Sequence, residues 1–251
     1  MVLIAIGTRF QGETRRRPAA AMGVIFYKGE WMDTGDDPVL SPTVSLIEQP
    51  PDFEFMPHFH RQNQFQVFVG GSGALGRQAL MPVVVHYAGA YTGYGPLVAG
   101  PQGIQYFTLR PVCESGFIPV AQRHEQMIAG PKRHAQSANI KVAGVEQMRT
   151  WSQIQESFEI PLGADGMGVS LVNLPAQARW LSSHPKGSQG QFLFVLQGTA
   201  LTAGHALGVW EQMYVSHDET IPRVMAGEQG VQFLCLYVPD KAPEYQQRQA
   251  Q

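Results

Sequence analysis

Ala99–Tyr106 reads AGPQGIQY, and Ala226–Phe233 reads AGEQGVQF, at an offset of 127 residues. Two further pairs of segments repeat in the same order: Gln64–Phe65 with Gln191–Phe192 at the same offset, and Val44–Ile47 with Val169–Val172 at an offset of 125 residues. Three ordered matches at nearly one spacing indicate an internal repeat, and the small drift fits one-residue changes in loops. A unit of this length is too long for a solenoid repeat and has the size of a whole barrel.

The composition favours an all-β protein. The 251 residues include 27 Gly and 18 Pro, scattered along the whole chain, which is typical of many short strands joined by turns. Short β-rich stretches recur in both units, at residues 65–69, 83–87, 106–109, 192–196 and 234–238. Helical periodicity is clear mainly at residues 121–128 and 144–154, so we expect a partly helical connector there.

Four segments are predicted. Residues 1–22 are expected to form a frayed or disordered arm, and residues 23–118 an N-terminal barrel that carries the functional site. Residues 119–158 would form the connector, and residues 159–245 a degenerate C-terminal barrel with a structural role.

Charge and cysteine content exclude several classes of function. The net charge of −2 gives no electrostatic reason to expect nucleic acid or an anionic membrane as a partner. No apolar run approaches the ~20 residues that a membrane-spanning helix needs. Cys113 and Cys235 offer neither a disulfide framework nor metal-type spacing. We therefore expect a cytoplasmic protein, monomeric or homodimeric, whose partner is a small molecule.

Two motifs stand in the first unit. One reads His58-Phe59-His60, three residues, Gln64, six residues, Gly71. The other reads Gly95, five residues, Pro101-Gln102-Gly103, two residues, Tyr106, three residues, Arg110. Their spacing resembles the two signature motifs of the cupin superfamily, which have Glu at the position of Gln64, His at that of Tyr106 and Asn at that of Arg110. The resemblance covers residues 24–239 and implies two tandem cupin-type jelly-roll barrels, a bicupin.

The second unit has lost most of this pattern. Its first motif reads His184-Pro185-Lys186, four residues, Gln191, six residues, Gly198, and its second ends at Phe233. One histidine is left, a lysine replaces the other, and the last ligand position is apolar. The sequence predicts a filled, mostly apolar interior in the second barrel.

The resemblance implies a metal site in the first barrel. Alternate residues of a strand project to one face, so His58 and His60 are expected to point into the barrel together. In the family, Glu and a third His complete a site for iron, manganese, nickel, copper or zinc. Here His58, His60 and Gln64 are the candidate metal ligands, and Tyr106 occupies the remaining position. The alternative is a metal-free pocket in which the histidines are hydrogen-bonded to Gln64 and Tyr106.

The same alternation extends the predicted pocket. Gln66 shares a face with Gln64, and Thr108 and Arg110 share one with Tyr106, so Gln66, Thr108 and Arg110 are candidate substrate-binding residues. Arg110 is always charged and suits a substrate carboxylate; the alternative is an internal salt bridge or exposure at the strand's end.

Tyr106 and His86 are the candidate catalytic residues. Either one would move a proton, and His86 would alternatively serve as a replacement third ligand. Two functions are open: a metal-dependent enzyme of dioxygenase, isomerase or lyase type acting on a small oxygenated or anionic substrate, and a metal-free ligand-binding or regulatory bicupin without catalytic activity.

Overall fold

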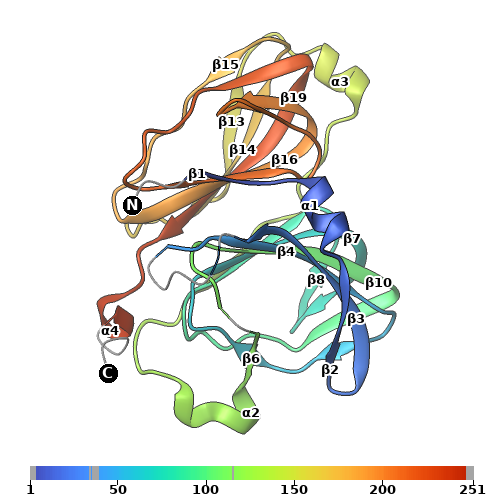
Figure 1. The fold of residues 1–251 in the computed structure, drawn as a ribbon, viewed down its shortest axis with the longest axis vertical. Helices are drawn as coiled ribbons and strands as arrows, with labels where there is room; N and C mark the ends of the chain where they lie inside the picture. The colour runs from blue at the N-terminus through green and yellow to red at the C-terminus, as the bar shows by residue number, and fades with distance from the viewer. Residues whose placement is uncertain (1–3, 34, 36–39, 115, 247–251) are drawn as a thin grey trace. The chain divides into compact units, whose positions relative to one another are not determined.

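The computed structural model describes residues 4–33, 35, 40–114 and 116–246, and the chain divides into two compact units. One unit, the N-terminal barrel, comprises the described residues of 11–140 with 241–246; the other, the C-terminal barrel, comprises residues 4–10 with 141–240. Each is built on one large antiparallel sheet (Figure 1). Among the described residues, no helix has the length and apolar character needed to cross a membrane.

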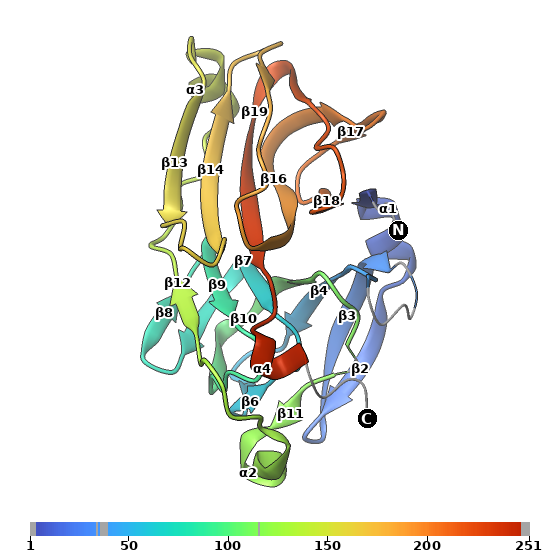
Figure 2. The same ribbon diagram turned by 90° about the vertical axis from the view of Figure 1, so that its left-hand side faces the viewer.

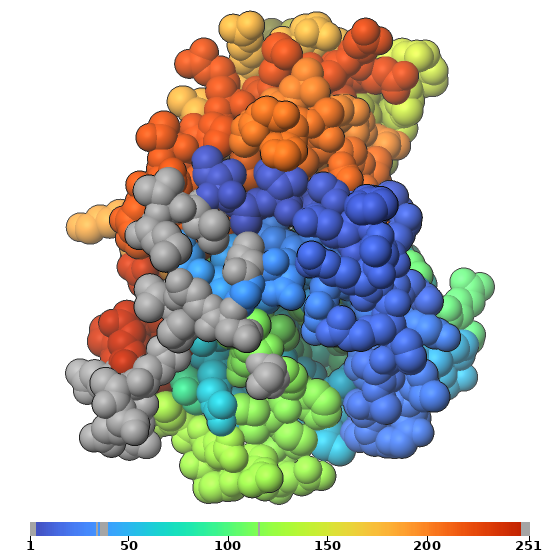
Figure 3. All heavy atoms as spheres, in the orientation of Figure 1, coloured from blue at the N-terminus to red at the C-terminus, as the bar shows by residue number. Residues whose placement is uncertain are grey.

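Within the described residues, the N-terminal barrel has a nine-stranded sheet. Its main path runs β12 (His134–Gln136), β9 (Val84–Ala88), β7 (Gln64–Leu75), β10 (Leu97–Arg110), β4 (Thr43–Gln49), β3 (Val24–Asp33) and β2 (Arg17–Ala21). Two shorter pairings complete it: β5 (Glu54–Phe55) with β10, and β8 (Gln78–Leu80) with β7. β6 (His58–Phe59) and β11 (Ile118–Pro119) form a separate two-stranded sheet. Its helices are α2 (Val120–Arg123), the 3-10 helix η1 (His124–Gln126) and α4 (Pro243–Gln246). The β2–β3 hairpin forms the lower blue surface in Figure 3.

The C-terminal barrel has an eight-stranded sheet over the same described ranges. Its main path runs β1 (Ile4–Gly7), β18 (Gln212–Ser216), β16 (Ser188–Thr202), β19 (Val224–Pro239), β14 (Gly168–Leu174) and β13 (Gln155–Ile160). β15 (Arg179–Trp180) pairs with β19, and β17 (His205–Leu207) pairs with β16. Figure 2 shows β13, β14, β19 and β16 side by side. The remaining helices are α1 (Arg9–Thr14), which joins β1 to β2, and α3 (Val145–Arg149).

The two sheets repeat one strand order, which confirms the internal repeat. The path β9-β7-β10-β4-β3 in one barrel corresponds to β18-β16-β19-β14-β13 in the other. In both, the two longest strands pair at the centre, β7 with β10 and β16 with β19. The all-β prediction of two tandem barrels is therefore correct.

Glycines in the repeated motif have a backbone function. Gly71 and Gly198 occupy equivalent places in β7 and β16 and have φ values of 67° and 82°. A Cβ atom at either position would collide with the carbonyl oxygen of Gly103 or Gly230 on the neighbouring strand. Only glycine combines this conformation with so close an approach, which explains why these positions recur.

The interior of the C-terminal barrel is filled, as predicted. Its core includes Val195, Phe233 and Cys235, all at most 2% exposed. A cavity of only ≈ 10 Å³ is left between Trp180 and Cys235. This volume is about that of one water molecule, so this cavity has no room for an organic ligand.

The N-terminal segment differs from the predicted arm. Ile4–Gly7 forms β1 and pairs with Gln212–Val215 of β18, while Arg17–Ala21 forms β2 and pairs with β3. The prediction is wrong for residues 4–21: main-chain hydrogen bonds hold residues 4–7 to a strand about 200 residues away and residues 17–21 to the next strand along the chain. Residues 1–3 lie outside the described part of the chain.

The predicted connector is also divided between the barrels. The boundary falls between residues 140 and 141; β12 belongs to the N-terminal sheet, and α3 and β13 to the C-terminal barrel. The predicted end of the C-terminal barrel at residue 245 is wrong as well. Lys241–Gln246 belongs to the N-terminal barrel, where Tyr245 packs with Phe59 and Tyr91 in one buried cluster.

Tyr245 attaches this returning tail. Its ring lies 4.9 Å from that of Tyr91, its hydroxyl donates to Pro131 O at 2.7 Å, and it accepts from Lys132 Nζ at 3.1 Å. Tyr245→Ala is expected to destabilise the N-terminal barrel by about 3 kcal/mol, because it removes a buried ring. Tyr245→Phe keeps the ring and should cost about 1 kcal/mol. Urea denaturation measures both.

The control for this prediction is Ile25→Ala on the exposed face of β3, where 63% of the residue is exposed. It should change the stability by less than about 1 kcal/mol. A Tyr245→Ala variant as stable as the wild type would show that the tail contributes nothing to the barrel.

Candidate ligand-binding site

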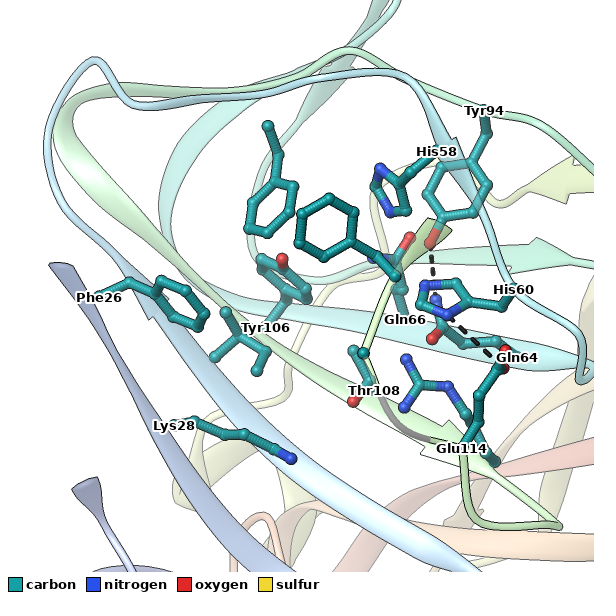
Figure 4. Close-up of a pocket in the computed structure, with 15 residues that line it drawn as sticks. Phe26, Lys28, His58, His60, Gln64, Gln66, Tyr94, Tyr106, Thr108 and Glu114 are labelled. Carbon is teal, nitrogen blue, oxygen red and sulfur yellow. Dashed lines mark hydrogen bonds and ion pairs between the residues drawn. The ribbon is translucent and has the colours of Figure 1, made fainter. Parts of the chain in front are cut away.

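An open cavity of ≈ 120 Å³ enters the N-terminal barrel. Polar side chains from β7 and β10 line one part of it, and Phe26, Ile47, Phe55 and Phe117 line another (Figure 4). The rings of Phe55 and Phe117 meet edge to face with centroids 4.6 Å apart. A closed cavity of about 150 Å³ accommodates benzene. This smaller cavity is open, so it suits a compact molecule with an apolar end inside and a polar end that extends toward the opening.

Strand alternation places five predicted residues in the cavity wall. Gln64 and Gln66 come from β7, and Tyr106, Thr108 and Arg110 from β10. The two strands are paired with Thr108 opposite Gln66. Alternate positions of both strands therefore project to one side of the sheet, where the cavity lies.

His58 and His60 also line the cavity. Their ring centroids are 5.4 Å apart, and the rings are nearly perpendicular. His58 Nδ1 lies 2.8 Å from Met56 O, and His60 Nδ1 lies 3.6 Å from Glu114 Oε2. In each ring the Nδ1 side is thus next to a protein oxygen.

Burial keeps these imidazoles neutral. Desolvation, together with the charges of His60 and Arg110, lowers the pKa of His58 to about 3. Desolvation and Arg110 also lower the pKa of His60. Desolvation raises the pKa of Tyr94 and of Tyr106, so both phenols stay protonated at neutral pH.

Glu114 was not predicted from the sequence. It follows β10 and lies in the cavity wall with 7% of its side chain exposed. Burial opposes its ionisation, but His60, Arg110 and the backbone N–H of Arg61 together hold its pKa below the usual range. The Arg61 amide donates to Oε1 at 2.7 Å. The one feature of the sequence that could have identified Glu114 is its position, as an acidic residue just beyond the strand that carries Arg110.

Tyr94 is the second residue that the motifs did not identify. Its backbone forms a bridge with His58, and its hydroxyl accepts a hydrogen bond from Gln64 Nε2 at 2.8 Å. This bond turns the amide nitrogen of Gln64 toward Tyr94. Figure 4 shows the tyrosine ring beside His58, with the hydroxyl toward Gln64.

His86 is not brought into the cavity wall. It lies directly opposite Gln66 in the β7–β9 pairing, and its Nδ1 is 2.9 Å from Gln66 Oε1. The predicted role as a direct base or third ligand is therefore not supported; His86 lies behind Gln66 and orients its amide. Tyr106 does face the cavity, and its hydroxyl accepts a hydrogen bond from Gln49 Nε2 at 2.8 Å.

No model of a known protein family matches the sequence, and no curated protein matches it significantly. Solved structures do match. A candidate dioxygenase from Nostoc punctiforme is 15% identical with a TM-score of 0.59, over 96% of this chain and 80% of that one. Oxalate decarboxylase from Bacillus subtilis, which has Mn(II) centres, is 12% identical with a TM-score of 0.58, over 96% and 78%.

A third structure, a bacterial pirin from Escherichia coli in complex with nickel(II), is 12% identical with a TM-score of 0.53, over 94% of this chain and 99% of that one. At these identities the likeness concerns the fold. The shared fold is consistent with the two cupin-type barrels that the motifs imply.

The residues present do not fit the divalent metal that these neighbours suggest. Among the described residues, no three His, Cys, Asp or Glu side chains are grouped so that they could hold a metal ion. The remaining two family ligand positions carry Gln64, a neutral amide, and Tyr106, a protonated phenol. Arg110 adds a permanent positive charge in the same cavity, which repels a cation.

Restoring the missing carboxylate tests this assignment. Gln64→Glu should increase the affinity for Mn²⁺ or Co²⁺ at least about tenfold, because one negative charge beside a divalent ion contributes several kcal/mol. Isothermal titration of the metal measures it. Gln66→Glu, which adds the same charge two residues along β7, should give a much smaller gain. Tight, stoichiometric metal binding by the wild-type protein would contradict the assignment.

A second prediction concerns acid stability. Burial lowers the pKa of His86 from 6.5 to about 3, so below pH 6.5 the unfolded chain binds a proton that the folded chain does not. The contribution of neutral His86 to the free energy of unfolding is therefore fully present above pH 6.5. It is lost as the pH falls toward 3, by about 1.4 kcal/mol per pH unit.

His86→Gln should remove that part of the slope between pH 6 and 4.5, as measured by urea denaturation at several pH values. The same substitution at the exposed His205 should leave the slope unchanged. A slope that is equal in the wild type and His86→Gln would show that the histidine is not buried in its neutral form.

Proposed function

We propose that the N-terminal barrel binds a small organic anion through Arg110 without a divalent metal. Arg110 carries a charge that it cannot lose, yet only 9% of the residue is exposed. A buried charge is costly unless it is paired and hydrogen-bonded. Within the described residues, its Nε has no hydrogen-bond partner. This incompletely satisfied guanidinium carries the proposal, since a carboxylate is its natural partner.

The other cation of the cavity is already paired. Lys28 Nζ lies 3.1 Å from Glu30 Oε1, and Arg17 adds a second contact to the same carboxylate at 2.6 Å. Lys28 is therefore less suited than Arg110 to bind a ligand carboxylate.

The apolar part of the cavity wall indicates what the rest of the ligand is like. Phe26 and Phe117 both pack against Phe55, with ring centroids 6.0 and 4.6 Å from it. Such a wall suits an aromatic or compact aliphatic body, and the volume limits its size. A phenyl ring joined to a short carboxylate has these properties, so phenylacetate is a suitable probe.

The alternative function is the metal-dependent dioxygenase, isomerase or lyase chemistry that the histidine pair suggested. It needs a third ligand beside the two histidines. Glu114 lies in the same wall, but among the described residues no three such side chains are grouped to hold a metal ion, and Arg110 opposes a cation. The metal titration of the preceding subsection separates the two functions. Location in the cytoplasm and a monomeric or homodimeric state stay predictions.

Arg110→Met is expected to weaken phenylacetate binding about 30-fold or more, because it removes a charge-assisted hydrogen-bonding pair of about 2 kcal/mol. Isothermal titration calorimetry or ligand-observed NMR gives the dissociation constant. The matched control is Arg77→Met, which removes the same charge from an exposed turn of the same barrel and should leave the constant unchanged. Equal binding by the wild type and Arg110→Met would overturn the proposal.

A further inference from the structure

Two buried acceptors lie in the wall of the same cavity. Within the described residues, Gln64 Oε1 and Glu114 Oε2 have no hydrogen-bond partner. Both side chains are more than nine-tenths buried, at 1% and 7% exposure. Leaving a buried acceptor unsatisfied costs about 1–3 kcal/mol, and more when it is charged. Both oxygens are therefore available to accept a hydrogen bond from a ligand in the cavity.

The groups that hold these two side chains leave both oxygens without a hydrogen bond. Gln64 Nε2 donates to the Tyr94 hydroxyl at 2.8 Å, which fixes the orientation of the amide. Glu114 Oε1 accepts from the Arg61 amide at 2.7 Å, whereas Oε2 is 3.6 Å from His60 Nδ1, longer than a hydrogen bond. Neither orphaned oxygen is therefore satisfied by the groups that hold its side chain.

Both acceptors are near the guanidinium that would bind the carboxylate. The β10–β7 register pairs Leu109 with Phe65. Because the two strands are antiparallel, the next residue of β10, Arg110, lies across from the residue before Phe65, which is Gln64. Side chains at such cross-strand positions are roughly 5 Å apart at Cβ. The charge of Arg110 also favours the ionised form of Glu114. A donor that reaches Gln64 must therefore lie only a few bonds from the ligand carboxylate, and the α-carbon is the nearest position that can carry one.

We propose that the ligand is a carboxylate that carries a hydrogen-bond donor on its α-carbon, an α-hydroxy or α-amino acid, with the donor directed to Gln64 Oε1 or Glu114 Oε2. The inference rests on the proposed function, because the carboxylate is held by Arg110. A hydroxyl matches the neutral amide of Gln64. An ammonium group matches the carboxylate of Glu114.

Three nearly isosteric compounds test the inference. Phenylacetate has no donor on the α-carbon, mandelate has a hydroxyl and phenylglycine an ammonium group. Their dissociation constants are measured with the wild-type chain, with Gln64→Leu and with Glu114→Gln, by calorimetry or ligand-observed NMR. The wild-type protein should bind mandelate or phenylglycine at least tenfold more tightly than phenylacetate. This comparison needs no variant and so does not depend on how the substitutions affect folding.

The variants identify the donor. A mandelate preference that disappears in Gln64→Leu assigns an α-hydroxy acid, and a phenylglycine preference that disappears in Glu114→Gln assigns an α-amino acid. Equal binding of all three compounds overturns the inference but leaves the proposed function intact. If the wild-type protein binds none of them at millimolar concentration, the proposed function and the inference both fail.

Discussion

The pairing of two long strands at the centre of each sheet is the constraint on which the rest of the molecule depends. In the N-terminal barrel β7 and β10 approach so closely at Gly71 and Gly103 that a side chain at Gly71 would meet the opposite carbonyl. That approach fixes the register, and the register determines which residues face the interior. A slip of one residue would turn Gln64, Gln66 and Arg110 away from the cavity.

The same scaffold has two different interiors. Positions equivalent to Gln64 and Gln66 carry Gln191 and Leu193 in the second barrel, and the strand equivalent to β10 presents Phe233 and Cys235. Apolar side chains there fill the space that the first barrel leaves open, so a cavity of ≈ 120 Å³ has a counterpart of ≈ 10 Å³. The strands of the second copy form a packed core of their own.

The sequence predicted those side-chain directions that follow from the alternation of residues along a strand. Spacing two residues apart on β7 and β10 was enough to place Gln66, Thr108 and Arg110 in the cavity wall. Glu114 lies beyond the end of β10, where the chain has no period from which a side-chain direction can be inferred. The positions of β1 and of Tyr245 depend on partners more than 100 residues away, and no local pattern encodes such pairings. His86 was misplaced because the pairing of β9 with β7 sets its ring against Gln66.

The substitutions in the two motifs act together on the charge of the cavity. Where the cupin motif has a glutamate, Gln64 removes one negative charge; where it has an asparagine, Arg110 adds a positive one. At an effective dielectric of 20, one unit charge at 4 Å changes the energy of a second by about 4 kcal/mol. Both changes therefore disfavour a divalent cation and favour an anion. Glu114, outside both motifs, returns one negative charge close to Arg110. A cavity with one fixed charge of each sign is better matched by a ligand that presents both an acceptor and a donor than by a simple anion.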